Sequence, residues 1–307
     1  MSLITVGSMA FDAIETPFGK IDKIVGGANI YIAYAASNFV KPVQMVGVVG
    51  NDFDHSILKD LESRGAQMDG VEIVTDKPSF FWSGKYHLDM NSRDTLITDL
   101  NVMADFKPIV PDTYQGADFL MLGNLTPSIQ ISVIEQLKTR PKLIVLDTMN
   151  LWMDIALDDL KTVLSKVDVL MVNDSEARQL SGEFSLVKAA QKIIGMGPKF
   201  LIIKKGEHGA LLFHENKVFS APALPLEEVF DPTGAGDTFA GGFIGYLAKS
   251  GDISFENMKR AIIVGSAMAS FCVEKFGPQR LQEITKEEID NRIKQFVNLV
   301  QFDIDLV

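Results

Sequence analysis

Short apolar runs alternate with helical segments along most of this chain of 307 residues. The runs are rich in Val, Ile and Leu, and they are apolar throughout, as expected for strands covered on both faces of a parallel sheet. The predicted strands cover residues 3–7, 44–49, 118–122, 143–146, 169–172 and 200–203. The predicted helices between them cover residues 30–39, 55–63, 129–137, 157–164 and 186–194. The alternation therefore predicts an α/β fold of three layers, in which helices flank a mainly parallel sheet.

Two segments, residues 11–24 and 80–89, break this alternation. Their polar and apolar residues alternate, which is typical of half-exposed strands. Such strands suit a small sheet that stands off the main body, either as a lid over a cleft or as an edge extension without function. No internal repeat or long linker is present, so residues 1–307 are expected to form one α/β domain. The lid strands would be inserted at about 11–24 and 78–103.

Composition argues against several functional classes. The 29 Lys and Arg against 40 Asp and Glu give a net charge of −11, whereas nonspecific nucleic-acid binding needs clustered basic residues. The single cysteine, Cys272, excludes an intramolecular disulfide and a multi-thiolate zinc site. The longest uncharged run, residues 24–40, contains Gly and Asn and is expected to be a buried helix rather than a membrane span. With no basic leader at the first residues, the cytoplasm is the expected compartment.

The most informative segment runs from Asp231 to Phe243. Pro232 and the nearby glycines indicate a loop, and the apolar pattern that follows indicates a helix whose first turn contains Asp237. The entry to this helix consists of three small residues, Gly234, Ala235 and Gly236. Free backbone N–H groups and the helix dipole favour an anion there, and Asp237 could accept a proton from a substrate hydroxyl beside a bound phosphate. The alternative is an ordinary helix N-terminus with an acidic first turn.

This segment is similar along its whole length to the C-terminal signature of the ribokinase-like PfkB family of carbohydrate kinases. Other stretches match the family in the same order over nearly the whole chain. They are Gly26–Gly27, residues 46–52, Asn173–Glu176 and Lys205–Gly209. The resemblance implies a ribokinase-like fold and an ATP-dependent kinase that phosphorylates a hydroxyl group of a small sugar. An adenosine-type nucleoside kinase would share this machinery, and a catalytically silent ligand sensor is the alternative outside the enzymes.

The resemblance also implies roles for the matched positions. Asp237 would be the general base, and the loop at Gly234, Ala235 and Gly236 would hold the transferring phosphoryl group. The residues implied on the ATP side are Asn173, Glu176, Lys204, Lys205, Gly206 and Gly209. Glu176 would act on Mg²⁺ through water, although Asn173 and Glu176 could instead form a capping box. Either Lys204 or Lys205 could reach an ATP phosphate as a point charge.

The acceptor side is implied at positions near strand ends. These residues are Asp12, Gly26, Gly27, Tyr31, Asn124 and Asn150. A carboxylate such as Asp12 can bind two adjacent hydroxyls, and strand ends of an α/β sheet face a cleft. Tyr31 departs from the Asn of ribokinase-type members, because it offers one hydroxyl and an aromatic wall but no paired amide donor and acceptor.

Three further expectations concern the surroundings of the site. K⁺ would be held near Asp231 and Thr233, with Gly277 in a second loop, although the segment 276–280 departs from the ribokinase version. The aromatic side chains that share one face of the second lid segment would either stack on a base or sugar or pack against the body. They are Phe80, Trp82 and Tyr86. The exposed edges of the lid strands are also expected to pair two subunits in a homodimer.

Overall fold

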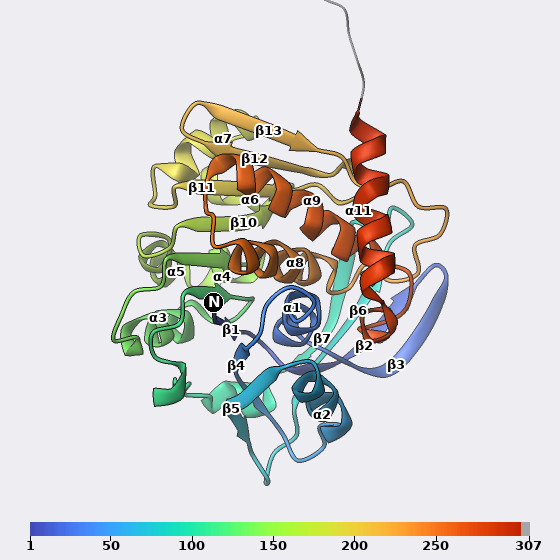
Figure 1. Ribbon diagram of the computed structural model, residues 1–307. Coiled ribbons are helices and arrows are strands. Elements are labelled where there is room, and N and C mark those ends of the chain that lie inside the picture. Colours follow the sequence, from blue (N-terminus) through green and yellow to red (C-terminus); the bar gives the residue numbers. More distant parts are fainter. Residues whose placement is uncertain (302–307) are drawn as a thin grey trace, which may run out of the picture.

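The computed structural model describes residues 1–301, in which nine strands form a main sheet (Figure 1). The strand order is β13-β12-β11-β10-β9-β8-β1-β4-β5. Neighbours from β11 to β5 are parallel, whereas β12 pairs antiparallel with β11 and with β13. The bounds are β1 Leu3–Val6, β4 Val43–Val49, β5 Ala66–Ile73, β8 Phe119–Leu122, β9 Leu143–Asp147, β10 Val169–Asn173, β11 Phe200–Lys204, β12 Ala210–His214 and β13 Lys217–Ala221.

Helices cover both faces of this sheet. On one face lie α1 (Ala28–Ala36), α8 (Ala235–Ser250) and α9 (Phe255–Cys272), which pack against one another in front of the sheet in Figure 1. On the other face lie α3 (Pro127–Gln136), α4 (Asn150–Ile155), α5 (Leu157–Leu164), α6 (Asp174–Ser181) and α7 (Leu186–Ile194). Successive residues of one strand enter different cores: Leu3 packs with the α8 side and Ile4 with the α5 side. This two-sided burial explains the continuous apolar runs and confirms the predicted three-layer α/β fold.

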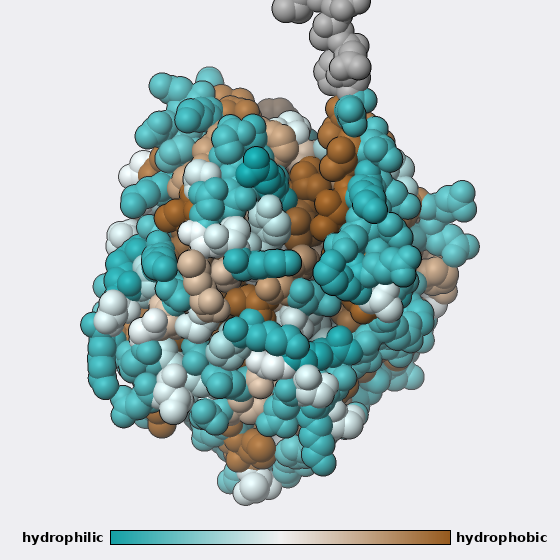
Figure 2. Space-filling view, viewed as in Figure 1, coloured by the Kyte–Doolittle hydropathy of each residue, from teal (hydrophilic) through white to brown (hydrophobic). Residues whose placement is uncertain are grey.

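The remaining helices lie around this framework. They are α2 (His55–Ser63), α10 (Gln279–Glu283) and α11 (Lys286–Val300), with short 3₁₀ turns at Asn101–Asp105, Asp112–Tyr114 and Gly206–His208. Figure 2 shows hydrophilic side chains over most of the face that carries α8, α9 and α11, with a hydrophobic strip between α9 and α11. Among the helices of residues 1–301, none has the length and apolarity that a membrane crossing requires.

A second, four-stranded sheet forms the lid, in the order β3-β2-β6-β7. Its strands are β2 Ala10–Thr16, β3 Gly19–Gly26, β6 Phe80–Tyr86 and β7 Arg93–Asp99. The segment 11–24 is therefore a hairpin of two strands with a turn at 17–18, and the predicted segment 78–103 contains the other two strands. β7 is exposed along its whole length at the edge of the lid.

Candidate active site

The loop before α8 has the geometry of an anion-binding helix entry. Gly234 precedes the helix with φ 76°, and a Cβ there would lie 2.4 Å from ring atoms of Tyr31, so this position needs glycine. The N–H groups of Gly236 and Asp237 donate to no backbone carbonyl within residues 1–301, and the N–H of Asp237 faces its own carboxylate. The N–H of Ala235 was expected to bind the transferring phosphoryl group as well. It instead donates to the carbonyl of Pro232 at 3.2 Å.

The side chain of Asp231 holds this loop in place through hydrogen bonds to two backbone N–H groups. Its two carboxylate oxygens accept hydrogen bonds from the N–H of Thr233 at 2.8 Å and of Gly277 at 2.9 Å, and the side chain is fully buried. The carbonyl of Thr233 also accepts a contact from the Cys272 thiol at 3.5 Å. The two loops that were expected to surround K⁺ are thus brought together. Both oxygens of Asp231, however, already have backbone donors.

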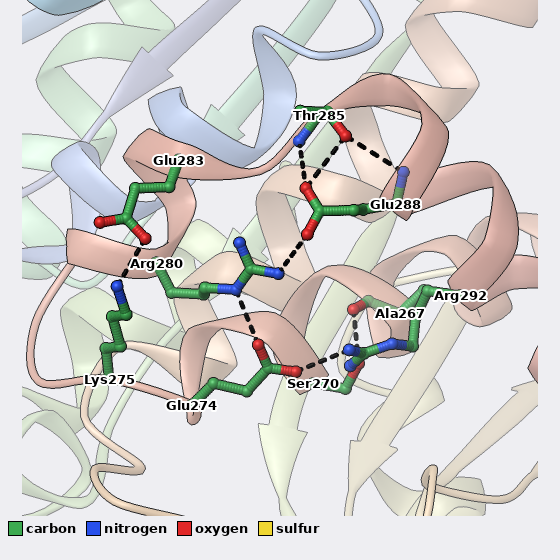
Figure 3. A network of polar contacts seen from close by, with 9 residues as sticks. All are labelled: Ala267, Ser270, Glu274, Lys275, Arg280, Glu283, Thr285, Glu288 and Arg292. Carbon is green, nitrogen blue, oxygen red and sulfur yellow. Dashed lines mark hydrogen bonds and ion pairs between the residues drawn. The ribbon is translucent and has the colours of Figure 1, made fainter.

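A network of ion pairs braces the second loop (Figure 3). Arg280 bonds Glu274 and Glu288, each at 2.7 Å, and Arg292 bonds Glu274 at 2.6 Å. Glu288 also caps α11 through Thr285. The guanidiniums of Arg280 and Arg292 lie over the ring of Phe271 in α9. The network therefore ties α9, α10 and α11 together around the segment that holds Gly277 beneath the anion loop.

The double glycine makes room for Asp12. A Cβ on Gly26 would lie 1.9 Å from Oδ2 of Asp12, and Gly27 has φ 91° at the start of α1. Asp12 is 4% exposed. Burial, and then the charges of Asp231 and Asp237, raise the pKa of Asp12 to about 8, while the N–H of Gly27 partly opposes this. The structure thus brings Asp12 against Gly26 and Gly27, close enough to Asp237 for the two carboxylates to repel.

Tyr31 lies beneath the loop rather than along an open cleft wall. Its ring supports Gly234, its side chain is 1% exposed, and its hydroxyl has no hydrogen-bond partner among residues 1–301. The expected aromatic wall is therefore wrong at this position, because the ring is used to support the backbone turn.

The ATP-side pair is placed by the strand β10 and the helix α6. Asn173 accepts the N–H of Glu176 at 2.8 Å, and Glu176 accepts the N–H of Asn173 at 2.7 Å, so the two form the capping box that was the alternative interpretation. Burial raises the pKa of Glu176 to about 7, although the Lys204 charge opposes the shift. The capping box holds the Glu176 carboxyl on the side of the site where Lys204 lies. A capping role and a role toward Mg²⁺ are therefore compatible.

Lys204, and not Lys205, reaches the anion loop. Its Nζ lies 2.5 Å from Oδ2 of Asp147, and it would lie 3.0 Å from a Cβ on Gly236. Burial opposes the charge on Lys204, but Asp147 and Glu176 more than offset this and raise its pKa. Asp147 was missed in the sequence, although a carboxylate that ends the buried strand β9 was a usable signal.

Asp237 completes this cluster. Burial is the largest influence and raises the pKa of Asp237 to about 7; Asp147 adds to the shift, whereas Lys204 and Arg93 oppose it. A carboxyl that titrates near neutrality can take up a proton at the pH at which an enzyme works. Arg93, at the start of the lid strand β7, was also missed in the sequence.

Gly206 and Gly209 form the turn after β11. Both have positive φ, 54° and 82°, and the carbonyl of Gly209 accepts the N–H of Lys205 at 2.8 Å. A Cβ on Gly206 would lie 2.1 Å from Oδ1 of Asn91, which belongs to the lid turn between β6 and β7. The lid therefore contacts the turn that was expected to bind the nucleotide.

Asn124 and Asn150 follow strand ends as predicted, but both side chains have protein partners. Asn124 accepts the indole N–H of Trp152 at 2.8 Å, and Asn150 donates to Gln179 at 2.5 Å. These bonds connect neighbouring segments of the fold. Neither amide forms a hydrogen bond with Asp12 or Asp237 within residues 1–301.

The donor set fits ATP phosphates better than a metal held by protein alone. The available N–H groups and Lys204 suit phosphate oxygens. Within residues 1–301, no group of three or more His, Cys, Asp or Glu side chains could hold a metal ion. Mg²⁺ would therefore be held mainly by the phosphates of ATP, with Glu176 and Asp147 as the fixed carboxyls beside Lys204.

Comparison with known proteins identifies the family. The model of the pfkB family carbohydrate kinases matches residues 2–285. The chain is 30% identical over 250 residues to a cytidine kinase of Thermococcus kodakarensis, covering 80% of this chain and 87% of that protein. A nucleoside kinase of Burkholderia thailandensis in complex with inosine has the same fold, with a TM-score of 0.76, 23% identity and coverage of 97% and 99%.

A structure described as a putative Ribokinase II from E. coli, in complex with ATP and Mg²⁺, also shares the fold, with a TM-score of 0.77. It is 20% identical, and the alignment covers 96% of this chain and 99% of that one. ATP with Mg²⁺ is thus the donor found in this family. The chain belongs to the pfkB family of carbohydrate kinases and is an ATP-dependent kinase that transfers a phosphoryl group to a hydroxyl acceptor.

Proposed function

We propose that this kinase phosphorylates a hydroxyl group of a nucleoside. The similarity to a cytidine kinase carries the proposal, since that relative matches 80% of the chain. The sequence alone favoured a small sugar and kept a nucleoside as the alternative, and the relatives support the alternative better. A small sugar remains the second candidate, because the pfkB family model describes carbohydrate kinases.

The inner face of the lid supports a nucleoside. In the β2–β6 register, Trp82 lies opposite Asp12, so the two side chains share one face of the lid sheet. The indole lies flat along this face, because a Cβ on Gly84 would meet it at 2.1 Å. If Asp12 binds hydroxyls of the ribose, Trp82 offers an aromatic surface to the attached base.

The phosphoryl transfer follows from the same arrangement. Asp237 accepts the proton as the acceptor oxygen attacks the γ-phosphorus, and the bond to the leaving ADP breaks. The N–H groups of Gly236 and Asp237, with Lys204, stabilise the charge on the transferring group. Mg²⁺ bound to ATP supplies further charge neutralisation.

An acceptor panel tests the proposal. Purified protein with ATP and Mg²⁺ is expected to release ADP with cytidine, inosine or adenosine, and at least tenfold less with free ribose, fructose or the isolated bases. The bases alone serve as the matched control, because they fill the Trp82 side but carry no hydroxyl. Turnover of free sugars without turnover of any nucleoside would overturn the proposal. Saturable binding without turnover of any compound would instead favour the silent sensor.

The rate is expected to depend on pH through Asp237. Because a general base must be ionised and the pKa of Asp237 is about 7, kcat should fall about tenfold for each pH unit below 7 and level off above it. The measurement is kcat at saturating ATP and acceptor between pH 5.5 and 8.5, with a coupling system checked at each pH. A kcat that stays constant over this range contradicts the assignment of the base.

Other parts of the proposal concern the surroundings. Exposed apolar side chains on the edge strand β7, Leu96 and Ile97, support pairing of two subunits through the lid. The neighbouring loops at Asp231, Thr233 and Gly277 stay the proposed place for K⁺, which carbonyl oxygens would have to hold because both carboxylate oxygens of Asp231 already accept backbone N–H groups. The cytoplasm stays the proposed compartment.

A further inference from the structure

The hairpin of β6 and β7 contacts both halves of the active site. On the acceptor side, the hydroxyls of Tyr86 and Thr233 share a hydrogen bond of 3.1 Å, which joins the lid to the anion loop. On the ATP side, Asn91 packs against Gly206. The hairpin turn between these two contacts leads directly into Arg93, the first residue of β7.

The strand register places Arg93 on the inner face of the lid. Arg93 pairs with Tyr86 across the β6–β7 ladder, and directly opposite residues of an antiparallel pair point to the same side. Since Tyr86 points to the anion loop, Arg93 does so as well. Its guanidinium also lies 5.8 Å from the centroid of the Trp82 ring, which belongs to the same face.

The N–H donors of the Arg93 guanidinium are available to a ligand at this position. Within residues 1–301, its guanidinium forms no ion pair and no side-chain hydrogen bond, and the residue is exposed. Its charge nevertheless opposes the rise in pKa of both Asp237 and Glu176, which lie on the acceptor and ATP sides respectively. A planar fork of N–H donors between these two sides matches the oxygens of a phosphate.

We propose that Arg93 is a catalytic residue whose guanidinium binds the γ-phosphoryl group of ATP during its transfer. The lid would supply this contact from the side opposite Lys204 and the N–H groups of α8. As the acceptor oxygen bonds to phosphorus and the bond to ADP breaks, charge on the transferring oxygens is neutralised from both sides. The assignment needs only the kinase activity and holds for a sugar or a nucleoside acceptor.

Arg93→Gln tests the assignment, with Lys85→Gln as the control. Lys85 carries the same charge on the same hairpin, but it pairs with Glu15 at 2.5 Å on the other face of the lid. Arg93→Gln is expected to lower kcat on the order of 10²-fold, while the KM for the acceptor changes less than threefold. Arg93→Lys should recover part of kcat, and Lys85→Gln should keep kcat within twofold of the unchanged protein.

The pH profile separates this role from a structural one. Removal of the positive charge should move the apparent pKa that governs kcat upward in Arg93→Gln, because Arg93 favours the ionised form of Asp237. Arg93→Lys should keep it close to that of the unchanged protein. Melting temperatures of all three variants, measured by circular dichroism, control for folding. A kcat within threefold of the unchanged protein together with an unmoved profile in Arg93→Gln would overturn the proposal.

Discussion

Replacing Asp237 with Asn is expected to lower kcat by about 10²- to 10⁴-fold and to leave ATP binding intact. The amide cannot accept the proton of the acceptor hydroxyl, whereas the N–H groups of the α8 entry and Lys204 are unchanged. ADP release gives kcat, and calorimetry with a non-hydrolysable ATP analogue gives the affinity. Retention of near-normal turnover would falsify the role of Asp237 as base.

The same variant is expected to unfold at a higher temperature. The folded-state pKa of Asp237, about 7, lies above its unfolded value near 3.8. The contribution of this group to the free energy of unfolding is therefore full below pH 3.8 and is lost as the pH rises through 7. Asp237→Asn has no carboxyl to ionise and so avoids this loss of stability. Its melting temperature should therefore exceed that of the unchanged protein at pH 8 but not at pH 4. Asp22→Asn, at an exposed position of β3, is the matched control and should show no gain.

Lys204→Met is expected to abolish activity and to destabilise the fold by about 3–5 kcal/mol. Its partner Asp147 is buried, and without Lys204 it would keep an uncompensated charge in the interior. Urea unfolding measures the free energy of unfolding, and ADP release measures the activity. Lys205→Met is the neighbouring control and should change stability by less than about 0.5 kcal/mol.

The double variant Asp147→Asn with Lys204→Met separates the effect of Lys204 on stability from its effect on catalysis. Removal of both charges should restore most of the lost stability, since no buried charge remains alone, while activity stays absent. Equal effects of the Lys204 and Lys205 variants, or restored activity in the double variant, would show that Lys204 does not serve the phosphate.

The sequence predicted the centre of the main sheet better than its edges. The central strands are buried on both faces, so their residues are apolar throughout and easily recognised. β5 and β13 were not predicted, because these edge strands mix polar and apolar residues. β12 was not predicted either, although four of its five residues are apolar. The segment 11–24 contained a turn that its alternating pattern did not reveal.

The site was predictable where its parts are close in sequence. The glycine-rich entry and Asp237 lie within one turn of the chain, so local reasoning was enough to place them together. Arg93 and Asp147 come from β7 and β9 and reach the site only through the fold. For Asn124 and Asn150, the position after a strand was predictable, but the partners that occupy their side chains were not.

The two hydrogen bonds that Asp231 accepts, from Thr233 and Gly277, have a consequence for synthesis of the protein. Asp12 and the double glycine leave the ribosome early, but the loop that faces them is held only when the N–H of Gly277 reaches Asp231. A growing chain therefore carries isolated fragments of the phosphate cradle until nearly all of it has been translated. A chain that lacks the segment around Gly277 is therefore expected to lack the held loop and with it the phosphotransferase activity.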